Sequence, residues 1–193
     1  MGKKVEAFVF KYRKFFALAA YVIPIGLKII LHGTTPMPLL IAGCIVMILG
    51  MTLRAFSGGY LLGKHIVIEV GADYLCTSGP FGYIRNPLYA GNVMVGIGVS
   101  IALNEWYGYV FIILTYVLMY SVIIPCEEKF LDEKFGDAFL EYKKHVRRFL
   151  PRLRAYQGNA KASCSLKKGL WSEKYFILLM TVAFVAFYFL FVR

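Results

Sequence analysis

The residues best suited to chemistry lie near the middle of the chain, in residues 79–91. Arg85, Asn86 and Pro87 stand there directly before a long apolar stretch. Proline fits the first turn of a helix, where its missing N–H is not needed. The free backbone N–H groups of that turn, together with the arginine cation, would attract an anion. The alternative is that Arg85 reaches for the membrane boundary and Asn86 merely caps the helix.

A second polar group follows about 35 residues later, at Cys126-Glu127-Glu128. One of these carboxylates could turn inward and accept hydrogen bonds from a hydroxyl or a cation. The alternative is that both acids form the hydrated start of a surface helix. Polar residues at both ends of an apolar hairpin are costly unless they line a site. We therefore expect Arg85, Glu127 and Glu128 to be catalytic, in a pocket that suits a zwitterionic ligand.

The elements that must hold these residues are membrane helices. Of the 193 residues, 59% are hydrophobic, whereas soluble domains average roughly 45–50%. The sequence predicts an all-α integral membrane protein with about five transmembrane helices, at residues 15–31, 38–53, 89–103, 107–125 and 175–192. Lys28, near the end of the first helix, is expected to extend to the interface.

The segments between these helices carry their own patterns. Ser57-Gly58-Gly59 predicts a helix break. Residues 66–70 and 74–76 are rich in β-formers, with Gly71-Ala72-Asp73 between them, and predict a small cytoplasmic β-hairpin. The whole chain is read as one membrane domain: a helix pair at residues 1–56, a core at 57–154, and a linker with a last helix at 155–193.

An amphipathic surface helix is predicted after the acid pair. Gly136-Asp137 marks its start, and Pro151 ends the pattern. Its apolar residues recur at helical spacing, and its lysines and arginines fall largely on the other face, as in helices that lie on a bilayer. The apolar positions are Phe135, Phe139, Tyr142, Val146 and Phe149. Residues 152–168 are predicted to be a flexible basic linker.

The charge distribution predicts topology. The formal net charge is +11, and no nucleic-acid motif accompanies it. Excess Lys and Arg mark cytoplasmic loops. We therefore expect the N-terminus, the hairpin and residues 126–174, hence the active site, to face the cytoplasm, with Arg193 outside. The same charge favours anionic lipid headgroups as partners. The oligomeric state is not predicted.

The four cysteines do not indicate a metal site or a disulfide. Cys44, Cys76, Cys126 and Cys164 lie in different segments, and none forms a CxxC pair. Scattered thiols in an apolar chain are ordinary packing residues.

The stretch from Leu75 to Pro151 resembles the integral-membrane methyltransferases that include the isoprenylcysteine carboxyl methyltransferases and the phospholipid methyltransferases. This stretch is about 40% of the chain. The matching blocks are Leu75-Cys76-Thr77-Ser78-Gly79-Pro80-Phe81, then Arg85-Asn86-Pro87-Leu88-Tyr89-Ala90-Gly91, then Glu127-Glu128-x-x-Leu131, Phe135-Gly136, Tyr142, Val146, Arg148 and Pro151.

This resemblance implies S-adenosylmethionine as cofactor and a lipid or lipidated acceptor taken from the bilayer. It assigns the hairpin positions and the central block to the cofactor, with Glu127 as the acid of the cofactor pocket and Glu128 beside it. The cofactor-binding residues implied are Tyr74, Leu75, Cys76, Phe81, Asn86, Pro87, Leu88, Tyr89 and Glu127.

Three positions depart from the pattern of the prenylcysteine enzymes. Asn86 stands where His is usual, Asp73 stands where His is common, and Ile123 stands where an acceptor-contacting Arg is expected. Arginine is the natural partner of an acceptor carboxylate. The acceptor therefore stays open between a prenylcysteine-like carboxylate and a phospholipid amine.

Two other functions compete with methyl transfer. NADPH-dependent membrane sterol reductases share an Arg-x-x-x-Tyr-x-Gly stretch, here Arg85, Tyr89 and Gly91. They usually continue with an acid, where this chain has Asn92, and they lack the glutamate pair. A non-catalytic membrane scaffold is the other alternative, and it is favoured by Asn86 and Ile123.

Overall fold

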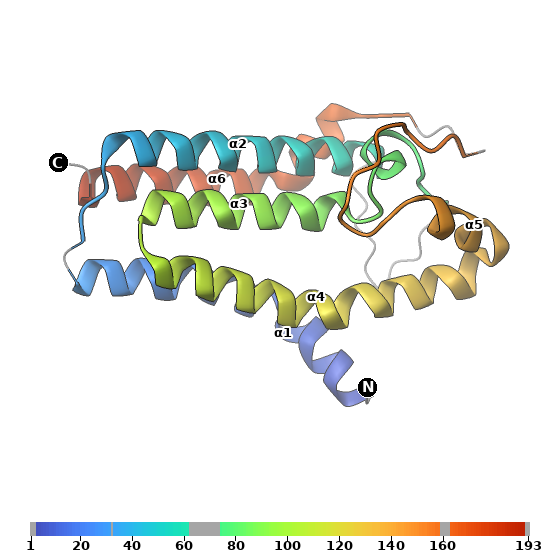
Figure 1. The fold of residues 1–193 in the computed structure, drawn as a ribbon, viewed down its shortest axis with the longest axis horizontal. Coiled ribbons are helices and arrows are strands. Elements are labelled where there is room, and N and C mark those ends of the chain that lie inside the picture. Colours follow the sequence, from blue (N-terminus) through green and yellow to red (C-terminus); the bar gives the residue numbers. More distant parts are fainter. Residues whose placement is uncertain (1–2, 32, 62–73, 159–162, 192–193) are drawn as a thin grey trace. The chain divides into compact units, whose positions relative to one another are not determined.

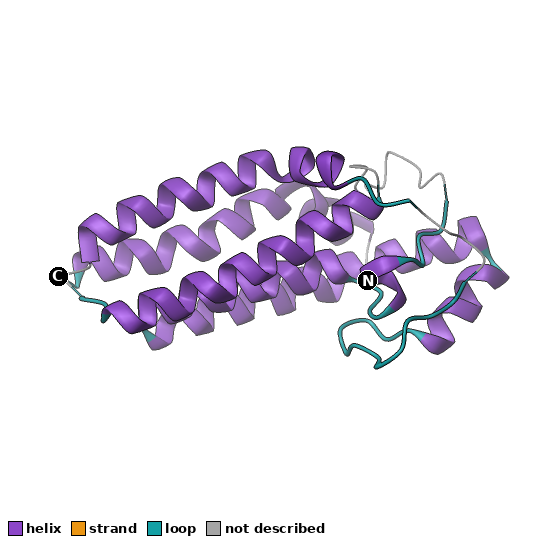
Figure 2. Ribbon diagram, turned by 90° about the horizontal axis from the view of Figure 1, so that it is seen from above, coloured by secondary structure: helices purple, strands orange, loops and turns teal. Residues whose placement is uncertain are grey.

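The computed structural model describes residues 3–31, 33–61, 74–158 and 163–191. Their helices are α1 (Lys3–Ile30), α2 (Met37–Tyr60), the 3-10 turn η1 (Gly79–Gly82), α3 (Pro87–Leu103), α4 (Trp106–Phe135), α5 (Asp137–His145) and α6 (Leu166–Phe191). Figure 1 labels the six α-helices. Figure 2 shows no strand in these segments. The predicted all-α class is therefore correct for the described residues.

The predicted β-hairpin is only partly within the described residues. Its first strand, at residues 66–70, and its turn, at 71–73, lie outside them. Tyr74, Leu75 and Cys76, predicted as the second strand, have irregular backbone instead. Side-chain packing against helices, described below, holds these three residues.

Two helices are long and apolar enough to cross a membrane. These are α2 and α4, and shorter apolar helices lie at Phe15–Ile30 and Pro87–Leu103. In lipid the backbone must satisfy its own hydrogen bonds, which explains why the apolar runs are helical. Five transmembrane spans were predicted. Among the described residues, the two at 38–53 and 107–125 lie in helices that are long and apolar enough to cross a membrane.

The helix break predicted at Ser57-Gly58-Gly59 is wrong, because α2 continues to Tyr60. Here glycine serves close packing. A Cβ on Gly169 of α6 would lie 2.1 Å from the Ala55 carbonyl oxygen and 2.7 Å from the Gly59 nitrogen. Small residues let two helix backbones approach this closely.

Helix α4 also runs beyond its predicted end at Pro125 and reaches Phe135. The acid pair therefore lies inside a continuous helix and does not start a new one. Glu127 and Glu128 are 8% and 6% exposed, so they are not a hydrated helix start.

The predicted surface helix is shorter than expected and its apolar face is covered by protein. Helix α5 begins after Gly136, which has φ +50°, and ends at His145. Val146 is already extended. Its buried residues pack against other parts of the chain rather than facing a bilayer: Phe139, Tyr142 and Val146 contact Leu75, Leu131, Phe135 and Tyr156.

Residues 152–156, predicted as flexible linker, are hydrogen-bonded at two points. The Arg152 N–H donates to the Tyr83 carbonyl at 3.1 Å, and the Tyr156 N–H donates to the Gly82 carbonyl at 2.9 Å. This part of the linker therefore covers the loop that precedes α3.

The chain divides into two compact units. The first comprises Met1–Gly50, Val93–Cys126 and Leu178–Arg193, and the second comprises Met51–Asn92 and Glu127–Ile177. Helices α2, α3, α4 and α6 each contribute residues to both units.

In the first unit Lys28 is buried, so the prediction that it reaches the interface is wrong. Its side chain is 0% exposed, and its Nζ donates to the carbonyls of Leu103 at 2.5 Å and Thr34 at 3.2 Å. The Nζ lies 3.7 Å from an oxygen of Glu105. Lys28 thus satisfies the Leu103 carbonyl at the C-terminal end of α3, which no intrahelical donor can reach, and the Thr34 carbonyl in the loop before α2.

Candidate functional site

Every predicted site residue lies in the second unit. Four segments meet there: the loop at residues 74–86, the first turns of α3, the last third of α4, and the extended residues after α5. The site divides into an arginine–glutamate group, a tyrosine–glutamate pair and an apolar cluster.

The arginine–glutamate group consists of Arg85, Glu128 and Arg148. Arg148 donates from Nε to Glu128 Oε1 at 2.9 Å and from Nη2 to Oε2 at 2.7 Å. Arg85 Nη2 lies 3.3 Å from Glu128 Oε1. The hydrogen bonds to Glu128 raise the pKa of the Arg148 guanidinium. Both oxygens of Glu128 are thus engaged, and its role in this geometry is to hold the two arginines.

Two nitrogens of Arg85 contact no acceptor within the part of the chain that the structure describes. Its side chain is 11% exposed, and its Nε and Nη1 are buried with no hydrogen-bond partner among the described residues. A buried donor without an acceptor costs about 1–3 kcal/mol, more when it is charged. These two nitrogens, which carry three N–H groups, are therefore available to an anionic ligand.

The backbone fixes Arg85 in place. Its N–H donates to the Arg147 carbonyl at 2.9 Å, and the next N–H, of Asn86, donates to the Arg148 carbonyl at 3.2 Å. The Asn86 carbonyl accepts from the Ala90 N–H at 3.0 Å, so Asn86 precedes the helix and Pro87 opens it, as predicted. The Asn86 amide lies 3.5 Å from the Arg148 carbonyl. The two backbone hydrogen bonds to the Arg147 and Arg148 carbonyls explain why the chain leaves helical geometry after His145.

The tyrosine–glutamate pair joins α3 to α4. Tyr89, in the first turn of α3, donates from its hydroxyl to Glu127 Oε1 at 2.6 Å. Neighbouring acids on α4 therefore have separate partners: Glu127 binds a tyrosine hydroxyl, whereas Glu128 binds two guanidinium groups.

The apolar cluster gathers most of the remaining predicted cofactor residues. Leu61, Cys76 and Phe81 are buried together, and the partly buried residues packed on them are Tyr60, Tyr74 and Leu88. The Tyr74 hydroxyl donates to the Tyr60 carbonyl. Burial raises the pKa of the Cys76 thiol to about 11, so the thiol is neutral and serves as an apolar packing group.

Tyr60 and Leu61, at the end of α2, were not predicted as site residues. Tyr60 packs so closely on the loop that a Cβ on Gly79 would lie 2.2 Å from its ring. Gly79 has φ +59°, which also favours glycine. Nothing in the short motif at residues 57–60 indicated this contact, because it joins segments that are far apart in sequence.

Leu75 belongs to a neighbouring cluster rather than to the one around Cys76. It contacts the group of Phe139, Tyr142 and Val146. The Tyr142 hydroxyl donates to the Phe81 carbonyl at 2.7 Å, and burial raises the pKa of Tyr142 well above its usual value. Leu75 and Tyr142 thus support the loop that carries Phe81.

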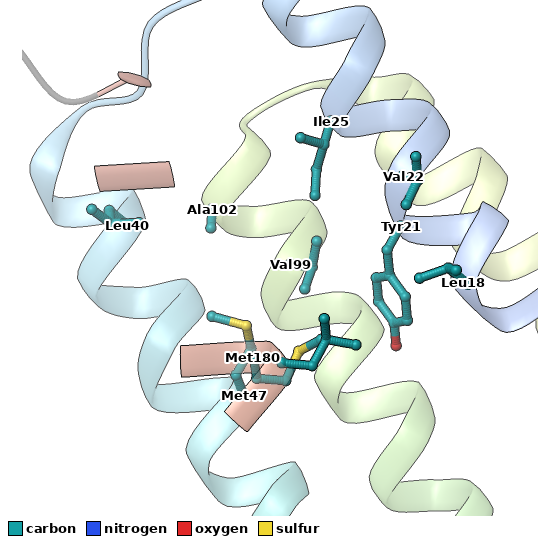
Figure 3. A pocket seen from close by; sticks show the side chains of 10 residues that line it. Leu18, Tyr21, Val22, Ile25, Leu40, Met47, Val99, Ala102 and Met180 are labelled. Carbon is teal, nitrogen blue, oxygen red and sulfur yellow. The ribbon is translucent and has the colours of Figure 1, made fainter. Parts of the chain in front are cut away.

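The first unit contains an apolar cavity of about 120 Å³. In Figure 3 side chains from several helices converge on it, among them Tyr21 and Ile25 of α1, Met47 of α2 and Val99 of α3. Its walls are almost wholly apolar. The Tyr21 hydroxyl lies 2.5 Å from that of Tyr116, so this polar atom is satisfied within the protein.

The described residues hold no group of three or more His, Cys, Asp or Glu side chains that could bind a metal ion. The four cysteines form no disulfide.

Comparison with known proteins places the chain in context. The model of the phospholipid methyltransferase family matches residues 38–138. The chain is 30% identical over 129 residues to the cobalt-zinc-cadmium resistance protein CzcN of Cupriavidus metallidurans, covering 66% of this chain and 56% of that protein.

Two further relatives are similar. The protein-S-isoprenylcysteine O-methyltransferase of Saccharomyces cerevisiae is 27% identical over 124 residues, covering 62% of this chain and 52% of that protein. The nickel-cobalt-cadmium resistance protein NccN of Alcaligenes xylosoxydans xylosoxydans is 26% identical over 116 residues, covering 58% and 51%.

The matched regions thus span about half the length of these curated relatives. The family match covers Tyr89 and the acid pair as well as the loop before them. The chain belongs to the phospholipid methyltransferase family.

Proposed function

We propose that this protein is an S-adenosylmethionine-dependent methyltransferase that acts at the membrane on a lipidic acceptor. The observation that carries the proposal is Arg85, which is tied to Glu128 yet keeps two buried donors without a partner among the described residues. In the adjacent helix turn, Tyr89 and Glu127 provide a second polar anchor.

The residues present fit the cofactor. Its adenine would suit the apolar cluster of Tyr60, Leu61, Tyr74, Cys76, Phe81 and Leu88. Glu127 would accept hydrogen bonds from a ribose hydroxyl or an ammonium, and Arg85 would bind a carboxylate. S-adenosylmethionine, when bound, supplies an electrophilic methyl group carried by a sulfonium.

The protein would contribute positioning and exclusion of water. An in-line displacement requires the acceptor nucleophile close to the methyl carbon. A carboxylate acceptor is already ionised and needs no base. An amine must lose its proton, and Glu127 is a carboxylate that could receive it, oriented by the Tyr89 hydroxyl. Glu128, held by two arginines, is less suited to that task.

A lipidic acceptor is supported by the family match and by the yeast relative. The family name points to phospholipids and the name of the yeast relative to an isoprenylcysteine. The acceptor is therefore a phospholipid amine or a prenylcysteine-like carboxylate.

The proposal includes five membrane crossings, with the N-terminus and the site in the cytoplasm. The basic residues at positions 3–14, ahead of the apolar part of α1, and those after α4 support this orientation. Reporter fusions at residues 104 and 158 test it. A periplasmic or luminal reporter should be active at 104 and inactive at 158, and activity at 158 would reverse the orientation.

Calorimetry with S-adenosylhomocysteine tests the cofactor. We expect the wild type to bind it and Glu127→Ala to abolish binding. Glu133→Ala, on the exposed part of the same helix, is the matched control and should bind normally. An unchanged affinity in Glu127→Ala would remove this residue from the site.

The acceptor is identified by adding purified protein and methyl-labelled S-adenosylmethionine to host membranes. Label in a lipid headgroup would indicate amine methylation, and label in base-labile protein esters would indicate carboxyl methylation. Cofactor binding without transfer of label to any fraction would favour a scaffold. Oxidation of NADPH by the purified protein would favour a reductase.

A further inference from the structure

A second buried ionic group lies in the unit that carries the candidate site. It joins Arg54 of α2, Asn92 of α3 and Glu173 of α6. Arg54 donates from Nε and Nη2 to Glu173 Oε2 at 3.1 and 2.6 Å, and from Nη1 to Asn92 Oδ1. The side chains of Arg54 and Glu173 are 15% and 3% exposed.

This arginine differs from Arg85 in having no donor nitrogen left for a ligand. All three nitrogens of Arg54 are engaged, and its guanidinium also lies over the Phe176 ring, 4.7 Å from the centroid. Its charge is matched by Glu173. A buried pair of this kind adds little to stability compared with apolar packing, and its better attested use is to fix one arrangement of helices. The group is therefore suited to positioning.

The Arg54–Asn92–Glu173 group contacts α3 near its start, through Asn92. Asn92 lies three residues after Tyr89, so the two side chains project from neighbouring turns on similar sides of the helix. Tyr89 in turn donates to Glu127. Side-chain ends lie roughly 5–6 Å from the helix axis, so a rotation of α3 by about 30° would move the Tyr89 hydroxyl by about 3 Å, enough to break that bond.

We propose that Arg54 and Glu173 are positioning residues that set the rotation of α3 and thereby hold Tyr89 on Glu127. Helix α6 would then help to position the site, although the family match ends at residue 138. The role of the Tyr89–Glu127 pair in catalysis rests on the proposed function, whereas its dependence on Arg54 does not.

The test places 3-fluorotyrosine at position 89 and records its ¹⁹F resonance in the detergent-solubilised full chain. Glu127→Gln gives the resonance expected when the Tyr89 bond is weakened. Glu173→Gln and Asn92→Ala should shift the resonance in the same direction. Asn92→Asp, which keeps an acceptor for Arg54, should restore the wild-type position. Glu133→Gln, which removes an exposed acid, should leave it unchanged.

A second readout links position to catalysis. Because Glu173 would act through Tyr89, we expect Glu173→Gln to lower kcat at least 10-fold in the wild type and by less than 2-fold in a Tyr89→Phe background. A merely structural role would lower both by the same factor.

The proposal is overturned if Glu173→Gln and Asn92→Ala leave the ¹⁹F resonance unmoved while Glu127→Gln shifts it. It is also overturned if the two losses of kcat multiply. If the wild type neither binds S-adenosylhomocysteine nor transfers methyl groups, the fluorine experiment still decides the positioning, and only the proposed function fails.

Discussion

Three arginines in one unit show how a residue's role depends on how many of its donors are engaged. All three nitrogens of Arg54 donate to neighbouring groups, and Arg148 donates from two of its nitrogens to Glu128. Arg85 has one nitrogen near Glu128 and two buried nitrogens with no partner among the described residues. We therefore propose a positioning role for Arg54 and Arg148 and a ligand-binding role for Arg85.

Arg85→Lys should therefore impair catalysis more than stability. Lysine keeps the charge but cannot present two donors in a fixed fork. Losing one or two charge-assisted hydrogen bonds, about 1.5–3 kcal/mol each, corresponds to a decrease of at least about 10-fold in kcat/KM. Steady-state kinetics and thermal unfolding in detergent measure the two effects.

Arg148→Lys is the comparison for Arg85→Lys. It weakens the bidentate contact to Glu128, and we expect a lower Tm together with a milder kinetic loss. Equal kinetic losses in the two variants would contradict the distinction between them.

Cys76 should be protected from thiol reagents, because burial raises its pKa to about 11. Only the thiolate reacts. At about pH 8 roughly one thiol in a thousand would be ionised, and raising the pH to about 10 should increase that fraction about 100-fold. A variant retaining Cys76 alone should therefore react slowly with iodoacetamide at pH 8 and much faster at pH 10.

The exposed Cys164 provides the reference. A variant retaining only this cysteine should be alkylated readily at pH 8. Mass spectrometry of both variants gives the rates, and equal rates at pH 8 would show that Cys76 is not buried as described.

At the scale of elements, the described glycines lie more often where two segments of the chain pack closely than where a helix ends. Gly58 and Gly59 lie within α2, and Gly169 of α6 packs on Ala55 and Gly59. Gly136 is different, because it has φ +50° and no atom within 4 Å of the position of an added Cβ. It separates α4 from α5 through conformation alone.

Gly169→Ala should destabilise the protein. Its Cβ would lie 2.1 Å from a backbone oxygen of α2, and overpacking of this kind costs about 1–3 kcal/mol. For a chain of this size that is a decrease of several degrees in Tm, roughly 2–4 °C per kcal/mol.

Gly26→Ala in α1 is the matched control for Gly169→Ala. Nothing lies within 4 Å of the added Cβ. Replacing glycine by alanine inside a helix stabilises it by about 0.5–1 kcal/mol, so Tm should stay constant or rise. A decrease of Tm in both variants would argue against the tight crossing of α2 and α6.

At the scale of the whole molecule the dominant quantity is the net charge of +11. Basic residues near a membrane surface are attracted to anionic lipid by about 1 kcal/mol each. Methyl transfer should therefore be faster in vesicles containing anionic phosphatidylglycerol than in pure phosphatidylcholine.

Salt separates this electrostatic effect from a specific headgroup requirement. In about 0.5 M NaCl the screening length falls to a few ångströms, so the difference between the two lipid compositions should largely disappear. A preference for anionic lipid that persists at high salt would indicate a specific lipid site instead.

The sequence by itself determined the all-helical class, the membrane character and the family, and it proposed the residues of the site. Apolar runs must become helices in lipid because their backbone groups have no other partners. The block from Arg85 to Tyr89 and the acid pair at Glu127 and Glu128 were identified because these motifs combine local residue types at short spacing.

Only the tertiary structure decided which partner each side chain has. In the folded chain Glu127 accepts a hydrogen bond from a tyrosine hydroxyl, whereas Glu128 forms ion pairs with two arginines. The tertiary structure also buried Lys28, continued α2 through its glycines, and brought Arg54 to Glu173, a residue 119 positions later. The physical reason is that a local pattern fixes which elements form, whereas the engagement of a buried polar group depends on atoms from distant segments.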